Sequence, residues 1–184
     1  MTYEIDIAGL KRELPICKVT DDLSIGAFVI FGDVELTVHC AEKLLELAPE
    51  YDVIVAPEAK AIPLAYEMAR QSGTNNYIIA RKHAKAYMKE VFEVNVKSIT
   101  TDMVQTLVLD STDAAYLKDK RVLLVDDVIS TGESIRAVEE LVKAAGGNVV
   151  GKMAPLAEGD AFERDDIIVL AKLPLFNSDG TVKE

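Results

Sequence analysis

The sequence predicts an α/β fold in which helices flank a central, mostly parallel sheet. Three short apolar runs, Asp52–Ala56, Tyr77–Ala80 and Val122–Val125, have the length and composition of strands buried on both faces of a sheet. The first and third runs are each followed by apolar residues at helical spacing, so strands and helices alternate along the chain. With 184 residues the chain is long enough for one full core, and we expect a single domain over residues 1–184.

Composition excludes several classes of protein. Hydrophobic residues make up 49% of the chain, which is typical of a globular protein. With 20 Lys and Arg against 31 Asp and Glu, the net charge of −11 disfavours nucleic acid and anionic membranes as partners. The apolar run Ile25–Phe31 is too short to span a bilayer, and the N-terminus lacks the pattern of a signal peptide. We expect a cytoplasmic protein in which Cys17 and Cys40 are reduced and buried.

The stretch that organises the chain is Arg121–Ser134, RVLLVDDVISTGES. Its apolar run leads into Asp126 and Asp127, and a short turn that contains Ser, Thr and Gly follows. A helix is then expected from the spacing of Ile135, Val138, Leu141 and Val142.

This order of strand, acidic pair, turn and helix has a chemical meaning. Ligands of open α/β sheets bind at the carboxyl ends of the strands, and a helix N-terminus favours a phosphate. Thr131 and Ser134 add hydroxyl donors, and Gly132 lets the backbone approach an anion closely. The two carboxylates suit sugar hydroxyls or an oxocarbenium-like centre. The alternative is a plain strand–helix junction with Ser and Thr caps, which leaves two consecutive Asp unexplained.

VLLVDDVISTGES resembles the signature of the type I phosphoribosyltransferases, which use phosphoribosyl pyrophosphate (PRPP). The resemblance implies that Asp126 and Asp127 are catalytic and face the ribose 2′- and 3′-hydroxyls. It also implies that Val128 and Ile129 contact the base or the sugar. The residues implied to bind the 5′-phosphate are Ser130, Thr131, Gly132, Glu133 and Ser134. Many members have Gly or Lys in place of Glu133, so we expect this side chain to point to solvent.

The loop after the first strand, Pro57–Lys60, resembles the Glu-Ala-Arg-Gly segment with which the adenine enzymes of this family bind pyrophosphate. Lys60 replaces the Arg of that segment and Ala61 replaces its Gly; Lys keeps the charge but loses the planar fork. We therefore expect Glu58, Ala59 and Lys60 to bind pyrophosphate. An ordinary strand–helix loop is the alternative.

The second expected pyrophosphate contact is basic. Four basic residues and no acidic one lie between positions 81 and 89, in a chain of strongly negative charge. One interpretation is a solvated basic face; the other is that Arg81, Lys82 and Lys85 bind the pyrophosphate of PRPP. The spacing Arg-Lys-x-x-Lys also resembles the adenine enzymes, which favours the second interpretation.

The family implies a flexible β-hairpin lid, which we place at residues 86–110. Its expected arms lie near Val91–Val96 and Thr106–Leu109, with a bend at Ser98–Asp102. The hairpin sequence of the adenine enzymes is not matched here. The acid that assists the base in those enzymes therefore cannot be assigned by matching, and Glu90 and Glu93 are two candidates for it.

The remaining segments complete the expected fold. We expect residues 1–34 and 158–184, at the two ends of the chain, to fold together as a small hood over the site. The N-terminal part of this hood should contain strands at Leu14–Val19 and Ala27–Phe31. Outside these strands we expect the following segments: a helix over Glu35–Leu47, a short helix over Asp113–Leu117, a strand over Val149–Ala157, a turn over Ala161–Asp166, a strand over Ile167–Leu170 and an apolar tail over Leu173–Phe176.

The resemblance implies transfer of the 5-phosphoribosyl group of PRPP to a purine, and we expect adenine as the base and AMP and pyrophosphate as products. Mg²⁺ would be held mainly by PRPP and water, without a metal site built by the protein. By analogy with the family we expect a homodimer. Three alternatives stay open: hypoxanthine, guanine or xanthine as the base; a non-catalytic PRPP sensor that regulates transcription; and a PRPP-binding or oligomerising protein without turnover.

Overall fold

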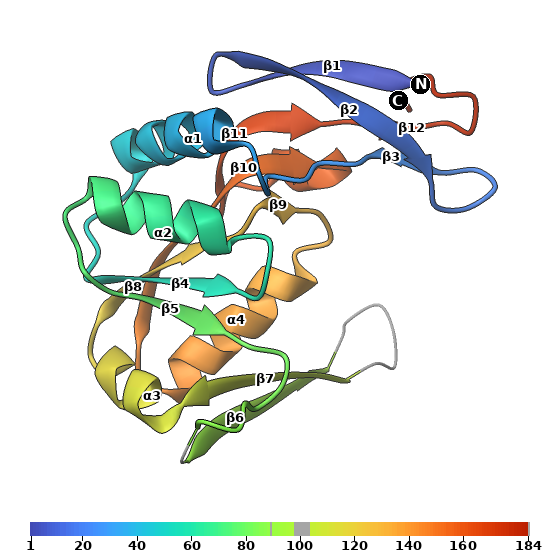
Figure 1. The fold of residues 1–184 in the computed structure, drawn as a ribbon. Helices are drawn as coiled ribbons and strands as arrows, with labels where there is room; N and C mark the ends of the chain where they lie inside the picture. Colours follow the sequence, from blue (N-terminus) through green and yellow to red (C-terminus); the bar gives the residue numbers. More distant parts are fainter. Residues whose placement is uncertain (89, 98–103, 184) are drawn as a thin grey trace.

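The computed structural model describes residues 1–88, 90–97 and 104–183 (Figure 1). Its main sheet has the strand order β11-β10-β8-β4-β5, with every neighbouring pair parallel. The short strand β9 pairs with the end of β10. The strands are β4 (Val53–Pro57), β5 (Tyr77–Ala80), β8 (Arg121–Val125), β9 (Val128–Ile129), β10 (Asn148–Glu158) and β11 (Ile168–Leu173). The predicted α/β class with a central parallel sheet is confirmed.

Two layers cover the sheet (Figure 1). One face carries α1 (Val34–Leu47) and α2 (Ile62–Gln71), which pack on each other. The other face carries α3 (Ser111–Leu117), α4 (Glu133–Ala144) and the hairpin of β6 (Val91–Lys97) and β7 (Val104–Asp110). All of these helices lie within a few residues of their predicted positions.

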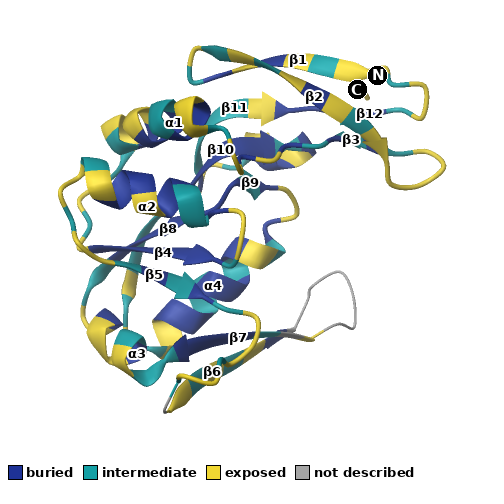
Figure 2. Ribbon diagram, in the orientation of Figure 1, coloured by how far each residue is buried: buried dark blue, intermediate teal, exposed yellow. Residues whose placement is uncertain are grey.

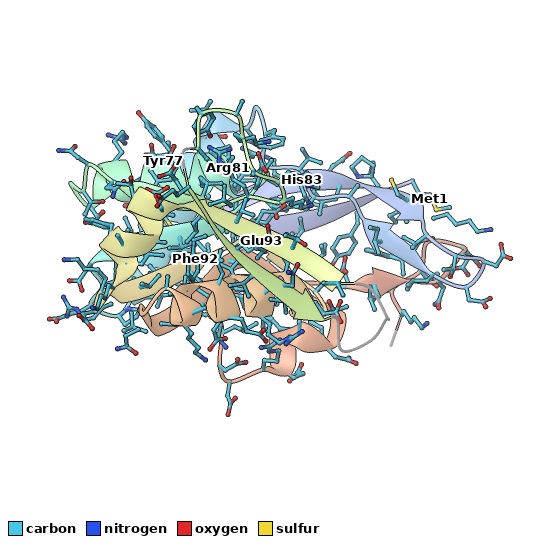
Figure 3. All side chains as sticks on the ribbon, turned by 90° about the horizontal axis from the view of Figure 1, so that it is seen from below. Met1, Tyr77, Arg81, His83, Phe92 and Glu93 are labelled. Atoms are coloured by element: carbon cyan, nitrogen blue, oxygen red, sulfur yellow. The ribbon has the colours of Figure 1, made fainter. Side chains whose placement is uncertain are left out.

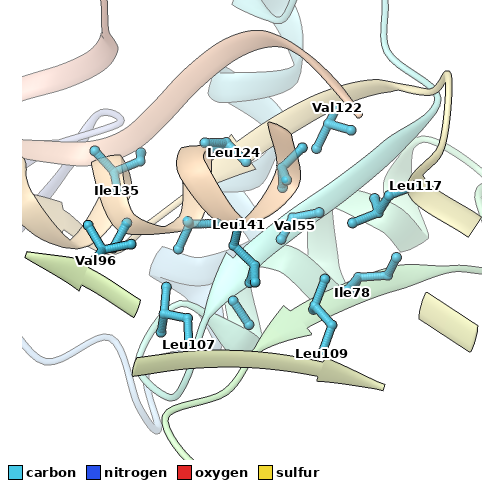
Figure 4. Close-up of a cluster of buried hydrophobic side chains, with 14 of the residues drawn as sticks. Val55, Ile78, Val96, Leu107, Leu109, Leu117, Val122, Leu124, Ile135 and Leu141 are labelled. Atoms are coloured by element: carbon cyan, nitrogen blue, oxygen red, sulfur yellow. The ribbon is translucent and has the colours of Figure 1, made fainter. Parts of the chain in front are cut away.

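Successive side chains of each strand point to opposite faces of the sheet, and a hydrophobic core lies on each face. In β4, Val55 belongs to the cluster under α4 and the hairpin, whereas Ile54 belongs to the cluster under α1 and α2. Figure 4 shows the first cluster, in which Leu124 and Leu141 meet Leu107 and Leu109 of the hairpin. The central strands β4 and β8 of the main sheet are buried almost throughout (Figure 2). This burial fixes the carboxyl ends of the strands, where the candidate site lies.

A second sheet, which we call the hood sheet, has the order β1-β2-β3-β12. Its strands are β1 (Thr2–Ile7), β2 (Leu10–Lys18), β3 (Ser24–Gly26) and β12 (Leu175–Phe176). Strands from both ends of the chain therefore meet here, and the two termini lie close together (Figure 1).

The strand predicted at Ala27–Phe31 is wrong. The strand is β3, which ends at Gly26, and Phe28 N–H then donates to the Gly26 carbonyl at 2.9 Å. This tight turn takes Phe28 and Ile30 out of the sheet and into the core, where both are buried. The apolar run therefore correctly indicated buried residues here, but these residues do not pair as a β-strand.

The C-terminal region also differs from expectation in detail. The predicted turn begins earlier, as a 3₁₀ helix over Gly159–Glu163, and the last parallel strand continues to Leu173. Leu175 and Phe176 are not a tail, because they pair with β3 in the hood sheet. Cys40 is buried as expected, but Cys17 is exposed, because its side chain lies on the outer face of β2.

The hairpin of β6 and β7 is present with both expected arms, and its predicted bend at Ser98–Asp102 lies outside the described residues. Val96 and Leu109 pack into the core, so the described arms are anchored. Figure 3 shows the hairpin crossing α4, with Phe92 and Glu93 on β6. Glu93 and Glu90 are exposed. No helix in the described part of the chain is long and apolar enough to cross a membrane.

Candidate active site

The candidate site lies where β8, β4 and β5 end side by side. Because these strands are parallel neighbours, the loops that follow them leave the sheet at the same edge. Asp126 and Asp127 follow β8, Lys60 lies in the loop after β4, and Arg81 follows β5. Residues that are far apart in the sequence are thereby brought together as predicted.

The acidic pair is the most enclosed polar group of the site. Asp126 and Asp127 are only 6% and 5% exposed. The Asp127 N–H donates to Asp126 Oδ1 at 2.8 Å, which fixes the first carboxylate. Burial, and after it the neighbouring charge of Asp127, raises the pKa of Asp126 to about 7. A carboxylate held in this way is costly without a ligand, so the pair is built for a hydroxyl-rich or cationic partner.

Lys60 supplies the nearest positive charge. Its Nζ lies 2.9 Å from Asp127 Oδ2, which makes an ion pair. The two groups are not aligned as a hydrogen bond, and Asp127 Oδ2 remains a buried oxygen without a hydrogen-bond partner among the described residues. The Lys60 side chain is 51% exposed, so its ammonium group also faces the open side of the site.

Glu58 is placed differently from its predicted role. Its carboxylate lies 3.3 Å from Arg81 Nη1 and 3.6 Å from Lys85 Nζ, and it accepts a 3.4 Å hydrogen bond from the Lys82 N–H. Burial alone would raise the pKa of Glu58. The Lys82 N–H and the charges of Lys85 and Arg81 outweigh burial and hold that pKa below its ordinary value. Glu58 therefore acts as an internal counter-ion for the basic residues that follow β5.

The turn between β9 and α4 encloses a small cavity. It is lined by Asp126, Val128, Ile129, Ser130, Thr131, Gly132, Ser134 and Ile135. Gly132 has a φ of 79°, a left-handed conformation that suits glycine, and it is the residue from which α4 begins. The first N–H groups of α4 are therefore directed toward this turn, as an anion site requires.

Residues 37–173 match the family described as phosphoribosyl transferase domain. The chain belongs to this family.

Individual relatives agree with the family match. The adenine phosphoribosyltransferase of Thermotoga maritima is 37% identical over 150 residues, which are 80% of this chain and 83% of the relative. The orotate phosphoribosyltransferase of Caldanaerobacter subterraneus is 33% identical over 100 residues, 54% of this chain and 41% of the relative. The crystal structure of the adenine phosphoribosyltransferase of Thermoanaerobacter pseudethanolicus has a TM-score of 0.65 at 24% identity. It covers 78% of this chain and 84% of that one, and it supports the fold.

Within this phosphoribosyltransferase chain, Glu133 does not line the small cavity. It is half-buried and faces a second hollow on the other side of Gly132, together with Arg136 and Arg164. We expected Glu133 to point to solvent, and the half-buried side chain meets this expectation only in part.

Sequence reasoning missed Arg164. Its guanidinium lies against Gly132, where any Cβ would collide with it. Asp166 holds the guanidinium through two hydrogen bonds, at 2.8 Å to Nε and 2.9 Å to Nη2. No spacing in the sequence points to this contact, because it joins the turn before α4 to the loop before β11.

The donor set of the site fits a magnesium ion that arrives with PRPP. No three His, Cys, Asp or Glu side chains converge as metal ligands within residues 1–88, 90–97 and 104–183. Mg²⁺ prefers oxygen ligands and keeps several waters, and the carboxylates of Asp126 and Asp127 would hold such an ion through water.

Proposed function

We propose that this protein transfers the 5-phosphoribosyl group of PRPP to adenine, with AMP and pyrophosphate as products. The observation that carries the proposal is the buried acidic pair, placed between the phosphate turn and the cationic loops after β4 and β5. This arrangement has one place each for a phosphate, a ribose and a pyrophosphate. The choice of adenine is supported by the 37% identity to the Thermotoga maritima enzyme.

The proposed roles follow the order of PRPP itself. Ser130 to Ser134, with the first N–H groups of α4, bind the 5′-phosphate. Asp126 and Asp127 accept hydrogen bonds from the ribose 2′- and 3′-hydroxyls. Lys60, Arg81 and Lys85 meet the pyrophosphate, and Lys82 and the Ala59 backbone lie beside them. Val128 flanks the base, whereas the side chain of Ile129, which was also expected to contact the base or the sugar, is buried on the opposite face of the sheet in the cluster under α4.

In the reaction the bond between C1′ and the pyrophosphate oxygen breaks, and its electron pair leaves with the pyrophosphate. N9 of the base forms the new bond to C1′ from the opposite side, and the proton of N9 passes to solvent water. Positive charge develops on the ribose ring, and the carboxylates of Asp126 and Asp127 stabilise it electrostatically. The basic loops stabilise the leaving group. The protein thus works mainly by positioning the reactants and compensating their charges.

Magnesium would offset part of the charge of the pyrophosphate when it is bound. The homodimer and the cytoplasmic location remain predictions of the family resemblance. The lid that the family resemblance implies for residues 86–110 also stays a prediction. The paired hydrogen bonds between Arg81 and Val108 tie the described arms of the β6–β7 hairpin to the end of β5, beside the site.

One assay tests the proposal. The protein is incubated with PRPP, Mg²⁺ and one base at a time, namely adenine, hypoxanthine, guanine, xanthine or orotate, and nucleotide and pyrophosphate are measured together. We expect AMP and pyrophosphate in equal amounts, with adenine as the preferred base. Preference for another base would contradict the assignment of adenine. PRPP binding without nucleotide formation from any base would favour a sensor over an enzyme.

A further inference from the structure

Glu158 is a carboxylate at the edge of the site to which the mechanism gives no role. It is the last residue of β10, in the sheet position next to β9. Leu156 of β10 pairs with Val128, which is proposed to flank the base, and Ala157 pairs with Ile129, so Glu158 lies just beyond the pairing of β10 with β9.

Register fixes the side of the sheet on which Glu158 lies. Glu158 pairs with Leu173 of β11, and paired residues of parallel strands share a face. Leu173 is buried in the cluster that includes Leu156 and Val128, and its Cδ1 lies 3.1 Å from where a Cβ of Gly26 in β3 would be. Glu158 is therefore on the face that meets the hood sheet, the same face as Val128.

The carboxylate is available to a ligand. Glu158 is half-buried, and within the described part of the chain no hydrogen bond or ion pair engages its side chain. Burial raises the pKa of Glu158, and the positive charge of Lys60 opposes that shift. The place of Glu158 at the rim of the site follows from the pairing of β10 with β9, because Val128 of β9 lines the small cavity together with Asp126.

We propose that Glu158 determines which purine is accepted, by taking a hydrogen bond from the exocyclic amino group of the base. The inference rests on the proposed function and adds a residue that recognises its second substrate. A carboxylate only accepts hydrogen bonds. It therefore favours the amino group of adenine and disfavours the carbonyl oxygen that hypoxanthine carries at the same ring position.

Two variants separate recognition from a structural role. Glu158→Gln keeps an acceptor oxygen of the same reach, whereas Glu158→Leu keeps the size and removes the acceptor. Asp160→Asn is the matched control, because Asp160 is an exposed carboxylate two residues further on, in the 3₁₀ turn. Each protein is assayed with adenine and with purine, which lacks only the amino group, at saturating PRPP and Mg²⁺.

The measured quantity is the ratio of kcat/KM for adenine to kcat/KM for purine. We expect Glu158→Leu to lower this ratio about 10- to 100-fold, the worth of a hydrogen bond to a charged group. Glu158→Gln is expected to keep most of the ratio and Asp160→Asn all of it, with the KM for PRPP unchanged in all three variants.

If the wild type makes AMP, two results overturn the inference alone. In the first, Glu158→Leu loses activity toward adenine and purine equally. In the second, Glu158→Leu leaves both activities unchanged. If Glu158→Leu is poorly folded, a Glu158→Gln protein with a collapsed adenine-to-purine ratio also contradicts it, because the acceptor oxygen is still present. A wild type that forms no nucleotide from either base refutes the proposed function, and the role of Glu158 falls with it.

Discussion

The Arg164 guanidinium occupies the space in which a side chain at Gly132 would begin. Arg164 is held there by Asp166, and Asp166 also accepts a 2.6 Å hydrogen bond from Lys152. A network of charged residues thus supports the outer side of the turn whose inner side is proposed to bind the 5′-phosphate. The shape of the turn therefore depends on residues that lie outside the Arg121–Ser134 motif.

The first prediction concerns this contact. Gly132→Ala places a Cβ into Arg164 and also strains a backbone with a φ of 79°. We expect the KM for PRPP to rise at least about tenfold, because the N–H groups of the turn move away from the phosphate. Steady-state kinetics with varied PRPP measure the change.

Gly73→Ala is the control for backbone strain alone. Gly73 has a φ of 73°, and nothing lies within 4 Å of its Cβ position. It should cost about 1–2 kcal/mol of stability and leave the KM for PRPP unchanged. An equal rise of KM in both variants would show that the contact with Arg164 is unimportant.

The second prediction is that replacing Asp126 lowers activity but raises stability. We expect Asp126→Asn to reduce turnover of PRPP about 10- to 100-fold, because a charged acceptor for the ribose is lost. The same variant should be more stable than the wild type at pH 8, by about 1–3 kcal/mol, because an unfavourable buried charge is removed.

The difference in stability between the wild type and Asp126→Asn should depend on pH, in a direction that follows from the pKa of Asp126. The pKa of Asp126 is raised in the folded protein to about 7, so the unfolded chain releases this proton first. The stability that Asp126 contributes is complete below about pH 4 and is lost as the pH rises toward 7. Denaturant unfolding without PRPP, from pH 4 to 8, should show this loss in the wild type relative to Asp126→Asn. Parallel curves for the two proteins would rule out the raised pKa.

The third prediction concerns Lys60. Lys60→Met removes the ammonium group that pairs with Asp127 and faces the proposed pyrophosphate position. We expect the KM for PRPP to rise about tenfold and to become less sensitive to salt, because one screened charge contact is lost. Lys43→Met is the matched control, since Lys43 pairs with Glu46 on the exposed side of α1. Unchanged PRPP kinetics in Lys60→Met would show that Lys60 does not contribute to PRPP binding.

The sequence predicted the part of this protein in which local pattern and tertiary structure agree. The apolar runs of β4 and β8 are buried on both faces, and the edge strand β5 is at least half-buried throughout, so the apolar pattern of each run predicts a strand correctly. The motif at Arg121–Ser134 carries its strand, turn and helix within one short stretch. For these reasons the main sheet and the acidic pair were found from the sequence.

The rest depends on contacts between distant segments. The apolar run at Ala27–Phe31 looked like a strand, but a turn at Ala27 sends Phe28 into the core. Glu158 reaches the site through the register of β10 with β9 and β11, and Arg164 reaches it from the loop that joins β10 to β11. Neither has a periodic or motif signal in the sequence, because their importance comes from the strands beside them.

Glu58 shows the same limit, and it gives the last prediction. The loop motif assigned Glu58 to pyrophosphate, but its carboxylate lies against Arg81 and Lys85 and therefore competes with an anion for their charges. Glu58→Gln keeps an acceptor for the Lys82 N–H and removes the negative charge. We expect pyrophosphate to bind about fivefold more tightly, since a like charge a few ångströms away costs about 1 kcal/mol in a hydrated site. Product inhibition by pyrophosphate measures this, with Glu46→Gln on α1 as the control. Weaker inhibition in Glu58→Gln would mean that Glu58 is needed to hold Arg81 and Lys85 in place, and that this positioning outweighs its charge.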